Sequence, residues 1–162
     1  MNAKKDQPQD VVVVTGSSGF IGSAVVVKLA ERFRVVGFDN EGSKHPPAVA
    51  ECVCVDVTSD DSVAAAMKRL RTAYGDRIAS VIHLAAYFDL TGEPNPKYEE
   101  VTVRGTERLL RAFQAFELEQ FVFVSTMLVH APGKHGKPIN EEWSLDPKLP
   151  YPESKILTER LL

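Results

Sequence analysis

The chain has 162 residues, of which 44% are hydrophobic and 25% charged, and this is enough apolar material for one ordinary globular domain. The net charge of −3 argues against a nucleic-acid surface, where clustered lysine and arginine would be expected. No run approaches the ~20 apolar residues that cross a membrane, and the polar start lacks the apolar core of a signal peptide. We therefore expect a cytoplasmic protein without nucleic-acid or membrane partners, preceded by a disordered lead-in over residues 1–10.

Predicted strands and helices alternate along the rest of the chain, as its hydrophobic periodicity indicates. We expect strands at 11–14, 34–39, 52–57, 81–84 and 121–124. We expect helices at 20–33, 60–74 and 96–116, and a last helix that begins near Pro152 and still runs at Leu162. Because strands separated by helices form parallel βαβ units, the pattern predicts an α/β fold with a Rossmann-like, doubly wound parallel sheet.

The last part of the chain bears on domain organisation. Because the sequence stops inside a predicted helix, we expect a sheet truncated before its last strand or strands and without a substrate domain. Residues 127–150 form a long connection rich in glycine and proline, and such connections are usually functional or disordered. Trp143 lies in this connection and fits either a lid or a small packing cluster.

Two cysteines, Cys52 and Cys54, lie on one predicted strand. Positions i and i+2 share a face of a strand about 7 Å apart, which is long for a disulfide. Two thiols with no histidine nearby are also a poor metal site. We interpret both cysteines as small core residues in a reducing compartment, and we predict no metal site in this chain.

A glycine-rich loop follows the first predicted strand. Gly16, Gly19 and Gly22 open the next helix with the spacing Gly-x-x-Gly-x-x-Gly. Glycine permits a tight turn, the close approach of a pyrophosphate and close packing of helix on strand. Phosphates would lie over the helix N-terminus, where free N–H groups and the helix dipole favour negative charge. The strand before the loop and the helix after it favour this interpretation over a simple small-residue turn.

Asp39 ends the second predicted strand, 17 residues after Gly22. A carboxylate near this spacing accepts hydrogen bonds from the adenosine ribose hydroxyls and repels a 2′-phosphate. No arginine stands beside it, since its neighbours are Phe38 and Asn40. We therefore expect NAD rather than NADP as the cofactor, the alternative being that Asp39 is a solvated turn residue.

Four segments together resemble the extended short-chain dehydrogenase/reductase superfamily, and within it the NAD-dependent epimerase/dehydratase family. They are Thr15 to Gly22, Asp56-Val57-Thr58, His83-Leu84-Ala85-Ala86 and Tyr151-x-x-x-Lys155. The resemblance runs from Val11 to Leu162, and the combination is far more specific than any one motif. It implies an NAD-dependent enzyme that oxidises, epimerises or dehydrates nucleotide sugars, steroids or related alcohols.

The resemblance also assigns roles to the positions that match the family's motifs. The implied catalytic residues are Thr126, Tyr151 and Lys155, with Thr126 placed 25 residues before Tyr151. Together with the loop and Asp39, the expected cofactor-binding residues are Gly16, Ser18, Gly19, Phe20, Ile21, Gly22, Asp39, Asn40, Asp56, Val57, Leu84, Ala85, Ala86, Tyr151 and Lys155.

Tyr151 and Lys155 share one helix face because they are four residues apart. A phenol has a pKa near 10, and lowering that pKa to about 7 requires roughly 4 kcal/mol of preference for the phenolate. A nearby ammonium and the positive nicotinamide ring can supply it. Tyr151 could then accept a proton from a substrate hydroxyl while Lys155 holds the nicotinamide ribose and Thr126 contacts the same oxygen. Outside this framework the same spacing is typical of a surface pair.

Three features depart from the family pattern. Thr102 stands in Thr-Val-Arg-Gly-Thr where the family usually has asparagine. Pro152 follows Tyr151 directly and predicts that Tyr151 occupies the helix N-cap. The chain is also about half the family's usual length, so we expect this fragment to bind cofactor weakly and to turn over no natural substrate.

The sequence thus predicts that residues 11–162 form an incomplete NAD-binding Rossmann domain of an oxidoreductase, epimerase or dehydratase. The expected chemistry is hydride transfer at a secondary alcohol of a nucleotide sugar or related small molecule. The alternative is a non-catalytic dinucleotide sensor or scaffold, which needs the glycine loop but not the Tyr151–Lys155 pair. The apolar faces of Leu110, Phe113 and Leu157 are compatible with a homodimer. We interpret His83 as a packed or hydrogen-bonded core residue.

Overall fold

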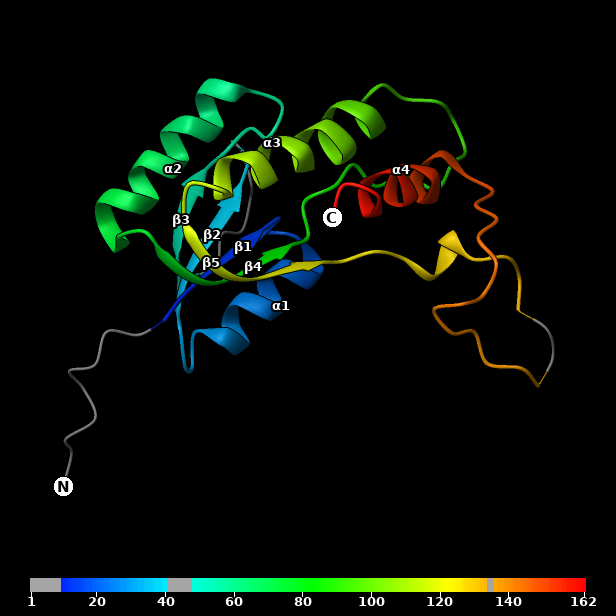
Figure 1. The fold of residues 1–162 in the computed structure, drawn as a ribbon, viewed down its shortest axis with the longest axis horizontal. Helices are drawn as coiled ribbons and strands as arrows, with labels where there is room; N and C mark the ends of the chain where they lie inside the picture. Colours follow the sequence, from blue (N-terminus) through cyan, green and yellow to red (C-terminus); the bar gives the residue numbers. More distant parts are fainter. Residues whose placement is uncertain (1–9, 41–47, 134–135) are drawn as a thin grey trace.

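The computed structural model describes residues 10–40, 48–133 and 136–162 and contains one five-stranded sheet (Figure 1). The strands are β1 (Val11–Thr15), β2 (Arg34–Asp39), β3 (Glu51–Cys54), β4 (Arg77–His83) and β5 (Glu117–Phe123). Their order is β3-β2-β1-β4-β5, and every pairing is parallel. This confirms the predicted Rossmann-like sheet, while nearly all of the expected lead-in falls on residues 1–9, outside the described part.

Helices cover both faces of the sheet. The helical elements of the described residues are α1 (Phe20–Leu29), α2 (Asp60–Tyr74), the π-helix η1 (Tyr98–Val103), α3 (Arg104–Phe113), the 3₁₀ turn η2 (Met127–Val129) and α4 (Pro150–Glu159). Figure 1 shows α1 on one side of the sheet and α2 and α3 on the other. Helix α4 packs against η1 and η2. Within the described ranges, no helix has the length and apolar character that crossing a bilayer requires.

The valine run of β1 supplies side chains to two cores. Val11 and Val13 pack with residues of α2 and α3, whereas Val12 and Val14 pack with Val26 of α1. Because successive side chains of a strand point to opposite faces, a continuous β-branched run suits a strand that is covered on both sides. Each fully buried valine contributes about 1.5–3 kcal/mol of apolar transfer free energy. The run therefore fixes β1 at the centre of the sheet.

The interpretation of Cys52 and Cys54 as core residues is wrong, because both side chains are exposed. In the described sheet β3 pairs only with β2, so it is an edge strand. Val53 is buried between the two cysteines, and strand alternation therefore turns both thiols outward. Burial is still enough to raise the pKa of the Cys52 thiol, with smaller contributions from Asp39 and Glu51.

Several predicted element boundaries are wrong. Helix α1 ends at Leu29, and the predicted helix at 96–116 is divided into η1 and α3. Helix α4 begins at Pro150 and ends at Glu159, so Tyr151 lies in the first turn and Leu149 takes the N-cap. Prolines are accepted there because the first N–H groups of a helix have no intrahelical partner. Phe113 is buried in the core and cannot belong to an exposed dimer face.

The long connection from 127 to 150 contains more structure than expected. It begins with η2, and an antiparallel bridge then pairs His130 with Leu145. Ala131 N–H donates to the Ser144 carbonyl at 2.8 Å, and the Trp143 indole N–H donates to the Ala131 carbonyl at 3.1 Å. Trp143 therefore ties the two ends of the connection together by a hydrogen bond within it. This favours the interpretation as a small packing cluster over that as a lid.

Candidate active site

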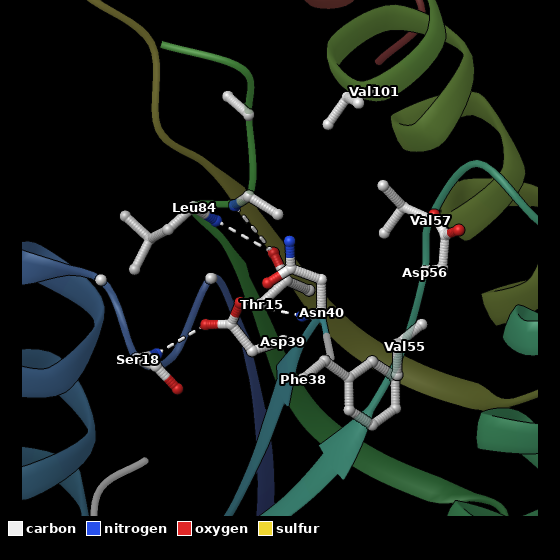
Figure 2. A pocket seen from close by; sticks show the side chains of 14 residues that line it. Thr15, Ser18, Phe38, Asp39, Asn40, Val55, Asp56, Val57, Leu84 and Val101 are labelled. Carbon is white, nitrogen blue, oxygen red and sulfur yellow. Dashed lines mark hydrogen bonds between the residues drawn. The ribbon is translucent and has the colours of Figure 1, made fainter. Parts of the chain in front are cut away.

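A pocket of about 430 Å³ opens at the carboxyl edge of the sheet, where β1, β2 and β4 end (Figure 2). Its lining residues are Thr15, Gly16, Ser18, Gly19, Phe38, Asp39, Asn40, Val55, Asp56, Val57, Leu84, Ala85, Ala86 and Val101. The chain crosses from β3 to the opposite side of β1 to form β4, so strand order reverses beside β1. Ligands of open α/β sheets bind at such a switch point.

The glycine loop leaves no room for a side chain at Gly16 or at Gly22. Gly16 has φ +66°, and a Cβ there would lie 3.0 Å from the Ala85 nitrogen. A Cβ at Gly22 would lie 2.0 Å from the Gly16 carbonyl oxygen. Only glycine fits either position, because the first has a left-handed backbone and the second holds α1 against the loop. The backbone of the loop therefore forms the pocket wall next to β4.

The N-terminus of α1 provides a site for negative charge. Gly19 is the N-cap and offers no capping side chain, and the first turn contains no acidic residue. The N–H groups of this turn, which includes Phe20 and Ile21, thus depend on partners outside the helix. The Phe20 and Ile21 side chains are exposed and do not line the pocket, so only backbone groups of these two residues are available to a ligand.

Two serine hydroxyls in the loop are buried without a hydrogen-bond partner among the described residues. They are the Oγ atoms of Ser17 and Ser18, and Ser18 lines the pocket. Gly37 of β2 makes space for Ser17, since a Cβ there would lie 2.6 Å from its Oγ. Buried polar groups normally have partners, so an unpaired hydroxyl beside a pocket fits a ligand rich in oxygen.

Asp39 is held over the pocket by two backbone donors. Its Oδ2 accepts from the Ser18 N–H at 2.7 Å, and its Oδ1 accepts from the Asn40 N–H at 2.9 Å (Figure 2). Each carboxylate oxygen can accept more than one hydrogen bond, so capacity remains for ligand hydroxyls. The pocket-lining residues named above include no lysine or arginine that could neutralise an added phosphate.

Asp56 and Val57 lie across the pocket from Ser18 and Leu84 (Figure 2). The Thr58 hydroxyl and N–H both donate to Asp56, and these hydrogen bonds hold the pKa of its carboxyl below the usual range. Apolar walls beside it come from Val57 and Val101. This end of the pocket combines a fixed anion with valine surfaces, which suits a flat ring that carries hydrogen-bond donors.

His83 is part of a buried hydrogen-bond network that supports the pocket. Its Nδ1 lies 2.7 Å from Thr15 Oγ1, and its Nε2 lies 2.8 Å from Thr106 Oγ1. Thr106 donates its hydroxyl proton to the Thr102 carbonyl at 2.5 Å, so it must accept from His83 Nε2–H. Nδ1 is then the acceptor for Thr15, which is consistent with the neutral ring.

The same network fixes the backbone of the pocket. Thr15 Oγ1 accepts from the N–H groups of Leu84 and Ala85 at 3.1 and 3.0 Å. Burial lowers the pKa of His83 to about 3, and Lys155 adds to this shift, so the ring is neutral at pH 7. His83 is thus a hydrogen-bonded core residue, as predicted. The roles of Thr15 and Thr106 were missed, because no local pattern reveals partners that are 68 and 23 residues away.

Thr102, at the position where the family usually has asparagine, connects three segments. Its Oγ1 accepts from the Tyr87 N–H at 3.0 Å. Its carbonyl accepts from Thr106 within the same helical segment and from Thr158 of α4 at 3.5 Å. A threonine therefore fills this buried position with its polar groups paired, and it joins η1 to α4.

Lys155 is the one cation of α4, and its side chain is buried at 2% exposure. Its Nζ lies 4.1 Å from the centroid of the Phe123 ring, close enough for a cation–π interaction. Burial lowers the Lys155 pKa to about 8, against the opposing effect of Glu159. The ammonium thus remains the main form at pH 7, but its charge is easily lost as the pH rises.

Tyr151 is half-buried, and its ring meets Phe88 edge-on with centroids 4.9 Å apart. Burial raises the pKa of Tyr151, so the protein environment alone does not produce the depressed pKa that a phenolate base requires. Thr126 caps η2 by accepting from the Leu128 N–H at 3.3 Å. It lines a second hollow together with Ser125 and Glu159, which are hydrogen-bonded to each other.

The structure brings together ten of the predicted cofactor-binding residues. The ten that line the pocket are Gly16, Ser18, Gly19, Asp39, Asn40, Asp56, Val57, Leu84, Ala85 and Ala86. The five that do not line it are Phe20, Ile21, Gly22, Tyr151 and Lys155. In the described part of the chain, no hydrogen bond joins the side chains of Thr126, Tyr151 and Lys155 to one another.

Comparison with known proteins decides the family. The profile described as "NAD dependent epimerase/dehydratase family" matches residues 12–162, which is most of the chain. The chain belongs to this family. Its members are NAD-dependent enzymes, and NAD is therefore the family's cofactor.

Two groups of curated family relatives are similar to the chain. The 3 beta-hydroxysteroid dehydrogenase type 7 of Mus musculus is 33% identical over 96% of this chain and 44% of its own length. The UDP-glucose 4-epimerase 4 of Oryza sativa subsp. japonica is 30% identical over 93% of this chain and 43% of its own length. The chain thus spans less than half the length of either relative.

Solved structures of family members show the same fold. The UDP-glucose 4-epimerase of Thermus thermophilus, in complex with NAD, has a TM-score of 0.78 at 30% identity and covers 93% of this chain. A short-chain dehydrogenase/reductase superfamily protein from Agrobacterium tumefaciens, with bound NAD, has a TM-score of 0.73 at 32% identity and also covers 93%. The chain covers 49% and 43% of these two proteins.

Proposed function

We propose that this chain is the NAD-binding part of an oxidoreductase, epimerase or dehydratase that transfers hydride at a secondary alcohol of a small molecule. The observation that carries the proposal is the pocket in which the glycine loop, Asp39, Asp56 and the end of β4 meet. Membership of an NAD-dependent family supports the same conclusion.

The lining residues fit the parts of NAD. The buried, unpaired Ser18 hydroxyl and the N-terminal N–H groups of α1 would bind the pyrophosphate. Asp39 would accept from the adenosine ribose hydroxyls, and Asp56 and Val57 would hold the adenine. Gly16 and Gly22 have no room for a side chain. The backbone of the loop can therefore come close to the phosphates.

The reacting residues are proposed to be Tyr151, Lys155 and Thr126. When bound, NAD would take up the hydride that leaves the alcohol carbon. As that carbon becomes a ketone, Tyr151 accepts the hydroxyl proton and Thr126 hydrogen-bonds the same oxygen. Because burial raises the Tyr151 pKa, the phenolate needs positive charge nearby, and Lys155, one turn along α4, is protonated at pH 7.

The proposed substrate class is supported by the names of the relatives, and the proposed assembly by an exposed residue of α4. The names of the relatives indicate hydroxysteroids and nucleotide sugars, and we propose a small hydroxylated molecule from these classes. Leu157 is exposed on α4 and is available to a homodimer contact, although Phe113 is not. A cytoplasmic location stays a prediction from the sequence.

The enzyme needs Tyr151 for its reaction, whereas a non-catalytic dinucleotide sensor does not. The test uses a chain extended at its carboxyl end to the length of its relatives and follows NADH formation with secondary alcohols. We expect Tyr151→Phe to lower the rate about 100-fold or more, as the loss of a general base does, without changing NAD affinity. Tyr74→Phe, on the distant α2, is the control and should retain the rate. A chain that binds NAD but forms no NADH with any alcohol, or a fully active Tyr151→Phe, supports the sensor instead.

A further inference from the structure

Glu159 is an acid at an electrostatically unfavourable place in helix α4. It is the last residue of the helix, and the last turn contains no basic residue. The unpaired carbonyl groups make the C-terminus of a helix negative, so a carboxylate there weakens the helix rather than stabilising it. Glu159 also takes part in none of the ion pairs of the described residues. Helix stability therefore does not account for an acid at this position.

The carboxylate of Glu159 is held by the segment that leads into Thr126. The Ser125 hydroxyl donates a hydrogen bond to Glu159 Oε1, and both side chains are partly buried. Ser125 directly precedes Thr126, which is the N-cap of η2. This hydrogen bond thus joins α4 to the backbone next to the threonine that is proposed to contact the substrate oxygen.

A second contact joins the end of β5 to α4 one helical turn earlier. Lys155 Nζ lies 4.1 Å from the centroid of the Phe123 ring. Phe123 and Ser125 are two residues apart, and both side chains face α4. Lys155 and Glu159 are four residues apart in the helix and therefore share one of its faces. Of the two contacts, the one made by Glu159 adjoins Thr126 in the chain.

Glu159 also acts on the charge of Lys155. Burial lowers the pKa of Lys155 to about 8, and the Glu159 carboxylate opposes this shift. The other ionisable groups on the segments around α4 are His83 of β4, Tyr98, Glu99 and Glu100 of η1, His130 after η2, and Glu141 in the hollow that Glu159 lines. His83 is neutral, and Glu99 is paired with Arg104. Among the described residues, Glu159 is the charge that raises the Lys155 pKa.

We propose that Glu159 is a positioning residue that ties the segment of Thr126 to α4 and stabilises the ammonium of Lys155. The proposal rests on the proposed function, in which Thr126, Tyr151 and Lys155 react. Because burial raises the pKa of Tyr151, its phenolate depends on the charge of Lys155. Loss of the Glu159 charge therefore reaches Tyr151 through Lys155, without any contact between Glu159 and the reacting atoms.

Two variants separate the charge of Glu159 from its hydrogen bond. Glu159→Gln removes the charge but keeps an oxygen that can accept from Ser125, whereas Ser125→Ala removes the hydrogen bond and keeps the charge. We expect Glu159→Gln to lower the pKa of Lys155 by about 0.5 unit or more, as the loss of one nearby charge does. Ser125→Ala should lower this pKa by less and should displace the methyl signal of Thr126.

The measurement is an NMR titration of the 162-residue chain with carbon-13 at the lysine Cε and threonine methyl positions, in which Lys155→Arg identifies the Lys155 signal by its absence. Glu153→Gln is the matched control, because Glu153 is an exposed acid of the same helix with the same change of charge. It should move neither signal. An unchanged Lys155 pKa in Glu159→Gln, an equal fall in Glu153→Gln, or an unmoved Thr126 signal in Ser125→Ala would overturn the proposal.

The rate of a chain extended to the length of its relatives shows whether the effect reaches the reaction. A fall of the Lys155 pKa from about 8 to about 7.5 halves the charged fraction at pH 8 and leaves it nearly unchanged at pH 6.5. Glu159→Gln should therefore form NADH about half as fast as the unchanged chain at pH 8, and nearly as fast at pH 6.5.

The dependence on pH distinguishes this role from a structural one. A loss of rate that is the same at both pH values, or no loss at either, would overturn the proposal. An unchanged extended chain that forms no NADH would instead contradict the proposed function. The Lys155 titration needs no activity, so its outcome decides the role of Glu159 in that case as well.

Discussion

The Asp39 carboxylate connects the second strand to the glycine loop through the Ser18 N–H at 2.7 Å. We expect Asp39→Asn to weaken NAD binding about ten- to a hundredfold, because hydrogen bonds to a charged acceptor contribute about 1.5–3 kcal/mol. The asparagine oxygen can still accept from Ser18, so the fold should persist. NADP binding should weaken less or improve, since the charge that repels a 2′-phosphate is gone.

A matched control for this prediction is Asp61→Asn, an exposed acid on α2 with the same change of charge. Its NAD affinity, measured by the same calorimetric titration, should equal that of the unchanged chain. Equal losses of NAD affinity in the two variants would show that net charge, rather than the ribose contact, is responsible.

Lys155 makes stability depend on pH in a definite direction. Its folded pKa of about 8 lies below the ordinary value of 10.5, so the fold favours the neutral amine. The unfolded chain binds the extra proton between these values, and stability should rise as the pH increases from 8 to 10.5. Below pH 8 the buried charge costs up to about 3 kcal/mol.

Lys155→Met should therefore stabilise the chain by up to about 3 kcal/mol at pH 6.5, and the difference should fall to about half at pH 9.5. Urea unfolding of both chains at the two pH values measures this difference. A variant that is less stable than the unchanged chain at pH 6.5 would mean that the Phe123 contact outweighs the desolvation of Lys155.

Single residues differ in how far the sequence could reveal them. The positions of Asp39, Gly16 and Gly19 in the pocket were predictable, because their spacing is typical of a dinucleotide-binding βαβ unit. The exposure of Cys52 and Cys54 was not, because the residue types give no sign that β3 lies at the edge of the sheet. The contact between Phe88 and Tyr151 joins two segments 63 residues apart and has no local signature.

At the scale of elements, α1 and the loop before it behave as one unit. A Cβ at Gly22 would lie 2.0 Å from the Gly16 carbonyl oxygen, and backbone rather than a flexible side chain would have to move. We expect Gly22→Ala to lower the free energy of unfolding by about 1–3 kcal/mol, as overpacking does, and to abolish NAD binding. Urea unfolding and an NAD titration measure the two effects.

Gly133→Ala is the control for this substitution, because a Cβ there would meet Ile139 at an ordinary 3.5 Å. It should change neither stability nor NAD affinity appreciably. Normal NAD binding by Gly22→Ala would show that the loop can shift without losing the phosphate site.

Element types were predictable from periodicity, whereas element boundaries were not. Helix α2 was predicted with the correct bounds, and the structure shows Ser59 as its N-cap and Gly75 as its C-cap. The π-helical turn η1 was missed, since its buried residues, Tyr98 and Thr102, have a spacing that an α-helix also shows. Helix α4 begins at Pro150 rather than near Pro152, which places Tyr151 inside the helix instead of at its cap.

At the scale of the whole molecule, the order of the strands in the sheet determines where the pocket lies. The reversal beside β1 brings the glycine loop, the end of β2 and the end of β4 to one edge, although they are separated by up to 70 residues. The His83 network then connects β1, β4 and the η1–α3 segment, and Thr158 extends it to α4. The cofactor pocket and the helix of Tyr151 and Lys155 are therefore held in one framework.

The most direct test of the central claim is a calorimetric titration of this chain with NAD and then with NADP. We predict that NAD binds with one site per chain and more tightly than NADP, because Asp39 repels a 2′-phosphate and the lining residues offer no cation to offset it. Tighter NADP binding would contradict the role of Asp39. The absence of binding by a chain whose circular dichroism shows the folded sheet would contradict the dinucleotide site itself.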